Sequence, residues 1–294
     1  MNKKVSLGER LFDISNVLLM LGLMIATFYP ILYVVIASLS NGSRLIAHQG
    51  LLLWPQGFSL DAYKAVLLNP SILQGYKNTL FIVIVGVAIN LVLTSIGAYF
   101  LSRDNVFWKA PIMMMIVFTM FFSGGLVPFY LTVRALGLYD SIWALIVPGA
   151  ISTFNLIIMR TYFQSIPKDM EESAVMDGAG HFTILFRVYL PLAMPVVAVM
   201  ILYYGVGHWN SWFNAMVFLR NHDLYPLQLI LRNILIDNDV ESMMGQTSTY
   251  MSKQEVAETV KYAAIMVSII PILLLYPYVQ KYFVKGVMIG ALKG

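Results

Sequence analysis

The charged residues with the most defined local pattern lie between Ile166 and Pro195, just past the middle of this 294-residue chain. Pro167 suits the first position of a helix, because its missing N–H would have no partner there in any case. Three acids follow at positions that a helix dipole favours: Asp169, Glu171 and Glu172. Gly178 tolerates the backbone angles that end helices. We therefore predict a helix over 168–176, a bend, and a second apolar segment over 181–190.

Around this bend the side chains are unusually small, which lets the surface of another protein approach the backbone closely. They belong to Ser173, Ala174, Gly178, Ala179 and Gly180. Glu172 and Asp177 add charged anchors beside them. The alternative is a helix that rests on the membrane surface, but such helices favour Lys, Arg and bulky apolar side chains. The pattern indicates an element that docks to a protein partner.

Residue patterns for catalysis or metal binding are missing from the sequence. It has no Gly-x-x-x-x-Gly-Lys-Ser/Thr loop, so it cannot hold nucleotide phosphates by that mechanism. It has no cysteine and no His-Glu-x-x-His, and the four histidines are far apart: His48, His181, His208 and His222. We expect no catalytic residue, no metal and no cofactor in this chain.

Composition predicts an all-α protein that crosses a membrane several times. Hydrophobic residues make up 59% of the chain and charged residues 12%, whereas soluble proteins have roughly 25% charge. The apolar residues form separate blocks of about 20, the length that spans ~30 Å of hydrocarbon. We expect one transmembrane domain over 1–294, with an N-terminal helix at about 12–40 and a core at about 77–284.

Six blocks are long enough to be transmembrane helices. They cover 17–38, 78–101, 111–133, 141–159, 188–213 and 262–279, with an interruption at 123–125 in the third and a partly helical stretch near 60–68 in the first loop. The interiors of the second, third, fourth and sixth contain no Asp, Glu, Lys, Arg or His. This counts against an ion-driven transporter, because such proteins need ionisable groups at depth.

Loop charge predicts the orientation. If the chain crosses six times, eleven of its 19 Lys and Arg residues lie on the side of the termini. The positive-inside rule then places both termini and the 166–195 stretch in the cytoplasm, and the polar segment 214–258 outside. The net charge of +4 is scattered over these loops, so we expect a lipid bilayer as partner and no nucleic acid.

The segment Glu172-Ser-Ala-Val-Met-Asp-Gly-Ala179, followed by Val188-Tyr-Leu-Pro191, resembles a known motif. It is similar to the cytoplasmic EAA loop of permease subunits in bacterial ABC importers, whose pattern is Glu-Ala-Ala-x-x-Asp-Gly-Ala, a spacer and Ile-x-Leu-Pro. Ser173 and Val188 are mild departures from that pattern.

Three further segments extend the resemblance over nearly the whole chain. Two of them resemble segments of sugar importers of the maltose-permease type: residues 160–167 (Arg-x-Tyr-Phe-x-x-Ile-Pro) and 209–215 (Trp-Asn-Ser-Trp-Phe-Asn-Ala). Residues 123–130 (Ser-Gly-Gly-Leu-Val-Pro-Phe-Tyr) look like a subgroup that handles complex oligosaccharides. The resemblance implies a permease subunit with the type I importer fold, and an oligosaccharide as substrate.

The resemblance also implies partners and a role for the loop at 167–187. They are a second, homologous permease, two ATPase subunits that bind ATP and Mg²⁺, and an extracytoplasmic solute-binding protein. The residues that would couple this chain to the ATPases are Glu171, Glu172, Ser173, Ala174, Asp177, Gly178, Ala179 and Gly180. We expect a bulky residue at Gly178 to abolish transport or ATPase recruitment without affecting membrane insertion.

Polar and aromatic residues in or beside the spans are candidates for the sugar path, because aromatic faces stack on sugar rings and amides bond hydroxyls in both directions. The strongest are Asn155, Trp209, Asn210, Trp212 and Asn214, and the weaker ones are Asn90, Thr94, Ser95, Thr153 and Tyr204. The alternative is structural, since polar residues also join spans by hydrogen bonds and Trp often marks the membrane interface.

Several alternatives stay open on the sequence alone. An autonomous secondary carrier or channel is the rival function, and buried ionisable residues or an inverted repeat would favour it. The substrate is as consistent with uronic-acid sugars as with neutral ones. Segment 214–258 either faces a binding protein or is a solvated loop of balanced charge. The tail at 281–294 either reaches an ATPase or binds anionic headgroups.

Overall fold

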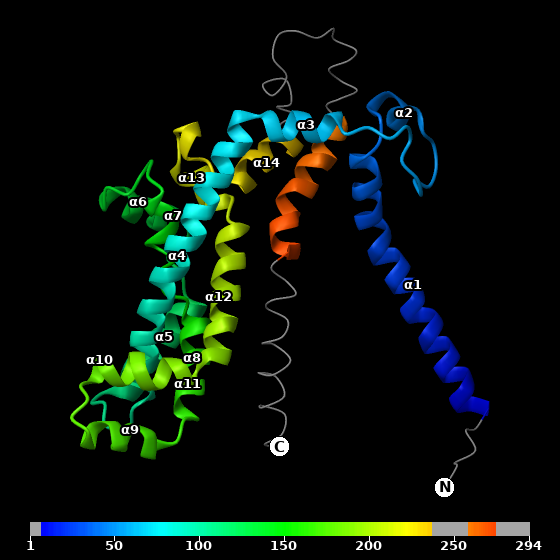
Figure 1. Ribbon diagram of the computed structural model, residues 1–294. Helices are drawn as coiled ribbons and strands as arrows, with labels where there is room; N and C mark the ends of the chain where they lie inside the picture. The colour runs from blue at the N-terminus through cyan, green and yellow to red at the C-terminus, as the bar shows by residue number, and fades with distance from the viewer. Residues whose placement is uncertain (1–6, 237–257, 275–294) are drawn as a thin grey trace. The chain divides into compact units, whose positions relative to one another are not determined.

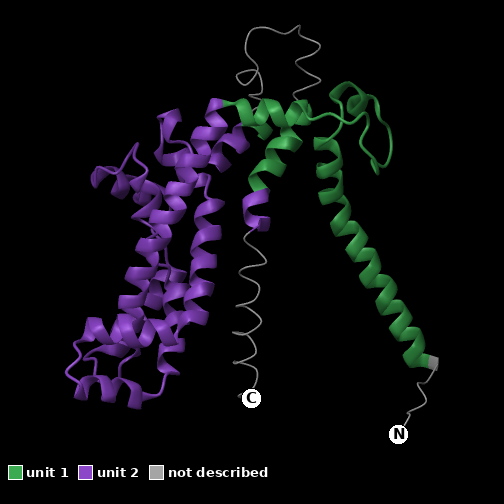
Figure 2. Ribbon diagram, in the orientation of Figure 1, with its two compact units in different colours: residues 1–69, 234–269 green, residues 70–233, 270–294 purple. Residues whose placement is uncertain are grey.

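The structure, a computed structural model, describes residues 7–236 and 258–274. Its named elements are all helices, and one isolated bridge joins Ser40 and Phe58. The predicted all-α class is confirmed. The chain divides into two compact units, residues 1–69 with 234–269 and residues 70–233 with 270–294 (Figure 2). The single domain over 1–294 stays a prediction.

Three named helices belong to the first unit: α1 (Leu7–Ser38), α2 (Gly42–Ala47) and α3 (Asp61–Leu68). α3 confirms the predicted helix near 60–68. Its small core joins the end of α1 to the helical residues from 258 onward, with the rings of Tyr33 and Tyr262 in edge contact at 5.7 Å. Most other side chains of α1 are exposed, as suits a helix surrounded by hydrocarbon.

At the centre of the second unit lies α4 (Pro70–Ser102), with α8 (Thr153–Gln164) and α12 (Met194–Trp209) packed against it (Figure 1). Large side chains such as Phe163 and Met200 are fully buried between them. At about 1.5 Å per residue, α4 extends well beyond the ~30 Å hydrocarbon layer. It therefore links the two ends of the second unit.

Side chains near the start of α4 hold the segment after α12. Asn78 donates to the carbonyl oxygens of Asp223 (2.7 Å) and Tyr225 (3.0 Å), and Thr79 accepts the N–H of Leu227 (2.9 Å). That segment contains α13 (Phe213–Phe218), the 3₁₀ helix η2 (His222–Leu224) and α14 (Leu227–Ile236). The prediction of a polar loop from 214 was wrong as far as 236, because α14 presents a buried apolar face.

Two predicted spans are broken in the structure. In place of a continuous helix over 111–133, α5 (Lys109–Phe121) and α6 (Leu126–Ala135) are bent by 114° at the predicted interruption, where Gly125 has φ +83°. In place of a helix over 141–159, α7 (Trp143–Ile146) stops before Pro148. The prediction of one continuous fourth helix was wrong, because Pro148 has no N–H to donate to a helical ladder.

The predicted fifth span begins with a bend of 88° instead of a continuous helix. Short helices α10 (His181–Ile184), η1 (Leu185–Tyr189, a π-helix) and α11 (Leu190–Leu192) precede it, and α12 starts only at Met194. Prolines at 191 and 195 flank this bend.

By length and composition, two described helices can cross a membrane, or four if each bent pair counts as one span. The chain is a multi-pass membrane protein, and the count of six stays a prediction. Residues 258–274 are helical. The rest of the predicted sixth span (275–279), the tail (281–294) and residues 237–257 of the predicted outer segment lie outside the described residues.

Candidate functional site

The predicted docking helix is present as α9 (Lys168–Met176), with the predicted bounds and with Pro167 as its N-cap residue instead of its first residue. Gly178 follows it with φ +77°. The N–H of Ala179 donates to Ala174 O and that of Gly178 to Val175 O, both at 2.9 Å. These two bonds form the Schellman motif that closes a helix on a left-handed glycine.

Glu171 is the internal anchor of α9. Its Oε1 pairs with the Arg103 guanidinium at 2.7 Å, and its Oε2 accepts the Tyr189 hydroxyl at 2.7 Å. The side chains of Arg103 and Glu171 are only 17% and 16% exposed. Both carboxylate oxygens are therefore used inside the chain, and α9 is tied to the end of α4 and to the π-helix η1.

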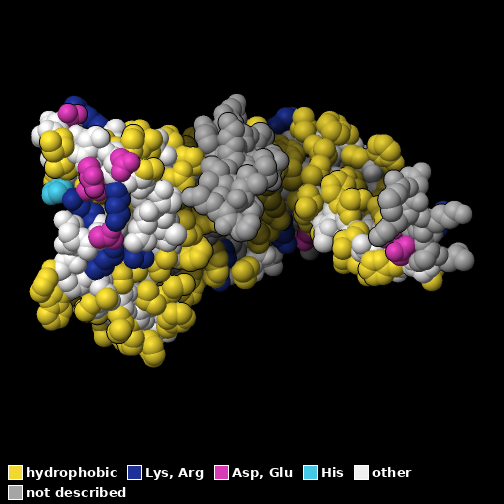
Figure 3. All heavy atoms as spheres, turned by 90° about the horizontal axis from the view of Figure 1, so that it is seen from below, with side chains coloured by type: hydrophobic (Ala, Val, Ile, Leu, Met, Phe, Trp, Pro, Cys, Tyr) yellow, Lys and Arg dark blue, Asp and Glu magenta, His cyan; other side chains and the backbone are white. Residues whose placement is uncertain are grey.

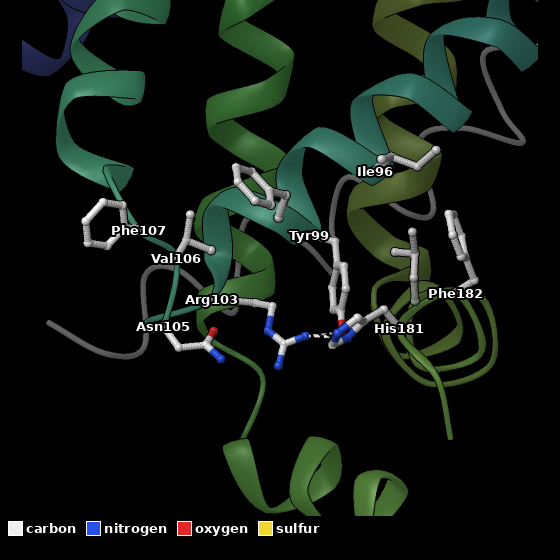
Figure 4. A pocket seen from close by; sticks show the side chains of 10 residues that line it. Ile96, Tyr99, Arg103, Asn105, Val106, Phe107, His181 and Phe182 are labelled. Atoms are coloured by element: carbon white, nitrogen blue, oxygen red, sulfur yellow. Dashed lines mark hydrogen bonds between the residues drawn. The ribbon is translucent and has the colours of Figure 1, made fainter. Parts of the chain in front are cut away.

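Arg103 also donates to side chains on the helices around it. Nη1 donates to Tyr99 OH (3.1 Å) and to His181 Nδ1 (2.6 Å; Figure 4). Because a guanidinium only donates, His181 Nδ1 accepts and the proton of this ring is on Nε2. Arg103 and His181 line a pocket of about 510 Å³ together with Ile96 and Phe182. Figure 4 shows Arg103 and His181 at the polar end of this pocket. Arg103 thus joins α4, α9 and α10.

An exposed ion pair attaches the start of α9 to the turn after α4. Lys168 Nζ donates to Asp104, and Lys109 lies 3.7 Å from the same carboxylate. The bond from Lys168 lowers the pKa of Asp104, and the same bond raises the pKa of Lys168. Seen from below, charged side chains of both signs gather at this end of the second unit, amid hydrophobic ones (Figure 3).

The predicted coupling residues divide between two faces of the loop. Glu171, Ala174 and Ala179 face inward, and both alanines pack on the core of the second unit. The remaining five are exposed: Glu172, Ser173, Asp177, Gly178 and Gly180. Added Cβ atoms at Gly178 or Gly180 would meet nothing within 4 Å. Met176, 86% exposed, adds an apolar side chain to this outer face.

The sequence analysis did not identify Arg103, Tyr189 and His181 as parts of this site. Arg103 is distant in sequence, and nothing local marks it as the partner of Glu171. A lone Arg at the end of a long apolar block is an ordinary membrane-flanking charge. The one signal is the position of Arg103 at a helix end that becomes buried, because a buried cation needs an anion nearby.

The five stronger candidates for the sugar path differ in burial and in contacts. Trp209 (6% exposed) and Asn155 (5% exposed) are both buried. The Trp209 ring meets that of Tyr76 edge-on at 6.2 Å. Among the described residues the Trp209 Nε1 has no partner. Asn210 donates back to Val206 O at 3.0 Å, while Trp212 is exposed and Asn214 half-buried. Their role in the sugar path stays a prediction.

Most of the weaker candidates make contacts inside the chain. Thr94 Oγ lies 2.7 Å from the Tyr204 hydroxyl, which accepts the N–H of Ser152, and Ser95 donates to the Met159 sulfur. The Thr153 hydroxyl lies 3.5 Å from the Thr119 hydroxyl. Such contacts fit the structural alternative of polar groups that join helices.

Asn90, the remaining candidate, belongs to a polar cluster on the face of α4 that packs against α12. It is fully buried and donates to the carbonyl oxygens of Gly149 (2.9 Å) and Ala150 (2.8 Å). Its Oδ1 lies 2.7 Å from His208 Nε2. Sequence reasoning counted His208 among the scattered histidines and did not single it out.

No group of three His, Cys, Asp or Glu side chains that could hold a metal ion occurs within 7–236 and 258–274.

Comparison with known proteins places the chain among transport components. Residues 79–289 match the family described as "Binding-protein-dependent transport system inner membrane component". The Bacillus subtilis (strain 168) protein LplC is 39% identical over 97% of this chain and 96% of its own length. YtcP of the same strain, described as a polygalacturonan/rhamnogalacturonan transport system permease protein, is 40% identical over 97% of this chain and 99% of its own.

A solved structure has the same fold. It is a crystal structure of a bacterial ABC transporter involved in the import of the acidic polysaccharide alginate. One of its chains superposes with a TM-score of 0.86 at 35% identity, over 96% of this chain and 100% of that chain.

Proposed function

Because the chain belongs to the family of binding-protein-dependent transport system inner membrane components, we propose that it is the permease subunit of an ATP-driven importer for a uronic-acid oligosaccharide. The coarser function, a sugar ABC transporter permease that is not an enzyme, follows from the family and the relatives. The coupling route, the partners and the class of sugar are our proposal.

The geometry of α9 is the observation that carries the coupling route. One face is fixed to α4 and η1 through Glu171, so a force on α9 reaches those helices through an ion pair and a hydrogen bond. The opposite face presents exposed acids, an apolar side chain and two glycines without neighbours. We assign that face to the surface of a separate ATPase subunit, and the 167–187 loop to the transmission of its closure.

The partners follow from what this chain lacks and what its family needs. No phosphate-binding loop occurs in its sequence, so ATP and Mg²⁺ bind to two partner ATPase subunits. A second, homologous permease completes the membrane pathway, and an extracytoplasmic solute-binding protein delivers the sugar. The chain lies in the bacterial cytoplasmic membrane with its termini in the cytoplasm.

The relatives support an acidic sugar. The relative at 40% identity is named for polygalacturonan and rhamnogalacturonan, and the structure at 35% identity belongs to an importer of alginate. All three are polymers that contain uronic acid, so their fragments carry carboxylates. We assign oligosaccharides of this class to the present chain.

Uptake by the reconstituted complex tests the proposal. The complex, purified from its native membrane, is placed in liposomes with the binding protein outside and is offered labelled oligogalacturonides or maltodextrins of equal length. We expect ATP-dependent uptake of the oligogalacturonides and little uptake of the neutral sugar. Uptake without ATP would contradict the ATP-driven importer and favour a secondary carrier. ATP-driven uptake of the neutral sugar alone would overturn only the sugar class.

A further inference from the structure

His208 places an ionisable group at depth in a chain whose other predicted spans lack one in their interiors. It lies on α12 and faces α4, with Asn90 as its partner. Asn90 lies about 18 Å along α4 from Ser102 and about 30 Å from Pro70, by the helical rise of ~1.5 Å per residue, and so is well away from both ends of this long helix. Gly86 makes room for the ring, because a Cβ there would lie 2.6 Å from His208 Nε2.

The contacts of Asn90 fix which nitrogen of His208 carries the proton. Both hydrogen bonds to Gly149 and Ala150 come from the Asn90 amide nitrogen, so its oxygen is the atom that faces the ring. That oxygen can only accept, and His208 Nε2 therefore donates to it. In the neutral ring, Nδ1 then has a free lone pair and accepts hydrogen bonds.

The His208 ring is half-buried, and its Nδ1 is the nitrogen that Asn90 does not hold. It has no bonding partner among the described residues, and it is not one of the buried side-chain atoms without a partner. A polar nitrogen that faced hydrocarbon would lose a hydrogen bond to water without replacement. Ionisable residues within membrane helices face the interior of the bundle or a water-filled path and mark substrate pathways.

We propose that His208 is a sugar-contacting residue of the translocation path, whose Nδ1 accepts a hydrogen bond from a sugar hydroxyl while its Nε2 is held by Asn90. The inference rests on the proposed function, because it needs a sugar to pass this chain. It assigns separate roles to the two nitrogens, one structural and one for the substrate.

Two substitutions of His208, by Gln and by Asn, separate these roles. In His208→Gln the longer amide reaches the place of Nε2 and can donate to Asn90, but it offers no acceptor at the place of Nδ1. In His208→Asn the shorter amide offers an acceptor near Nδ1 and loses the bond to Asn90. A purely structural histidine tolerates Gln better than Asn, whereas a sugar-contacting Nδ1 requires the opposite order in transport.

The test compares both variants with the wild type in the whole reconstituted complex, by oligogalacturonide uptake per assembled complex and by thermal melting. We expect His208→Gln to assemble and melt like the wild type and to transport about fivefold more slowly, the worth of one hydrogen bond. His208→Asn should melt at a lower temperature and transport faster per complex than His208→Gln.

Wild-type uptake by His208→Gln would overturn the proposal, as would losses of uptake that follow the melting temperature in both variants. The wild-type complex is the control for the proposed function. If it takes up no oligogalacturonide with ATP, the function fails before the histidine is tested.

Discussion

At the scale of single residues, neighbouring glutamates on α9 have opposite environments. Both oxygens of Glu171 are bonded within the chain, whereas Glu172 is exposed with its carboxylate available to a partner. The resemblance alone gave both acids the same role. The structure separates them into a residue that holds α9 in place and a residue that a partner can touch.

This difference predicts distinct effects of the same substitution. Glu171→Gln leaves the Arg103 guanidinium, largely buried, without its counter-charge, and we expect a loss of about 2 kcal/mol in stability. Glu172→Gln should not change the melting temperature but should weaken ATPase binding. Thermal melting and co-purification of the complex measure the two effects. Equal melting temperatures for both variants would contradict the inward role of Glu171.

How much of this site the sequence reveals depends on how local its causes are. The bounds of α9 follow from a proline, early acids and a left-handed glycine, all within about a dozen residues. The partners of Glu171 do not, because Arg103 lies at the end of a different helix and reaches α9 only through the tertiary fold. His208 is visible in the sequence as an ionisable residue within the fifth predicted block, but its pairing with Asn90 depends on a contact between two helices.

At the scale of elements, the ion pair of Lys168 with Asp104 attaches the start of α9 to the turn after α4. The lowered pKa of Asp104 means that its contribution is complete above the ordinary value of 3.8 and is lost as the pH falls through the lowered value. The raised pKa of Lys168 means that its contribution is complete below 10.5 and is lost at higher pH. The attachment is therefore constant at neutral pH.

A spin label reports this attachment. The chain has no cysteine, so Val175→Cys introduces a single labelling site on α9. In a His181→Gln background, which removes the nearby imidazole, we expect label mobility to be constant from about pH 5 to 9 and to rise below about pH 4. A change in mobility between pH 5 and 9 would contradict the assignment. In Lys168→Gln the low-pH rise should vanish, and the overall effect should be small because the pair is exposed.

Element boundaries were harder to predict than element type. The fourth block reads as one apolar stretch because hydropathy is averaged over a window, which conceals Pro148 and Gly149. The structure instead starts α8 at Thr153, where Ser152 caps it by accepting the N–H of Asn155. A capping serine beyond a Pro-Gly pair is a local signal that outweighs apolar composition.

At the scale of the whole molecule, the orientation rests on loop charge and is open to a direct test. Met176 at the end of α9 is 86% exposed and Trp54 in the first loop 79% exposed. We expect a membrane-impermeant maleimide to label Trp54→Cys in intact cells, or in spheroplasts, and to label Met176→Cys only after the membrane is opened. The reverse pattern would invert the topology and place α9 out of reach of any cytoplasmic ATPase.

The family and the all-α membrane class could be predicted from the sequence, because composition and the EAA-like motif are properties of the chain alone. The number of spans could not, since bent helix pairs have the same hydropathy as straight spans. Contacts with other subunits also depend on surfaces that one chain does not contain.

The central claim is that the exposed face of the 167–187 loop binds a separate ATPase. Gly178→Val alone is ambiguous, because φ +77° strains any β-branched residue. Gly180 has φ −76°, and an added Cβ meets nothing within 4 Å, so Gly180→Leu enlarges this face without strain inside the chain. Gly22→Leu on α1 is a matched control, also without neighbours within 4 Å.

The most direct measurement is recovery of ATPase with the tagged chain from its native membrane, for the wild type, Gly22→Leu and Gly180→Leu. We predict that the wild type and Gly22→Leu retain the ATPase and a second permease, and that Gly180→Leu retains the permease but loses the ATPase. Full recovery of ATPase with Gly180→Leu would contradict the account, as would a wild-type chain that carries no ATPase and transports sugar without ATP.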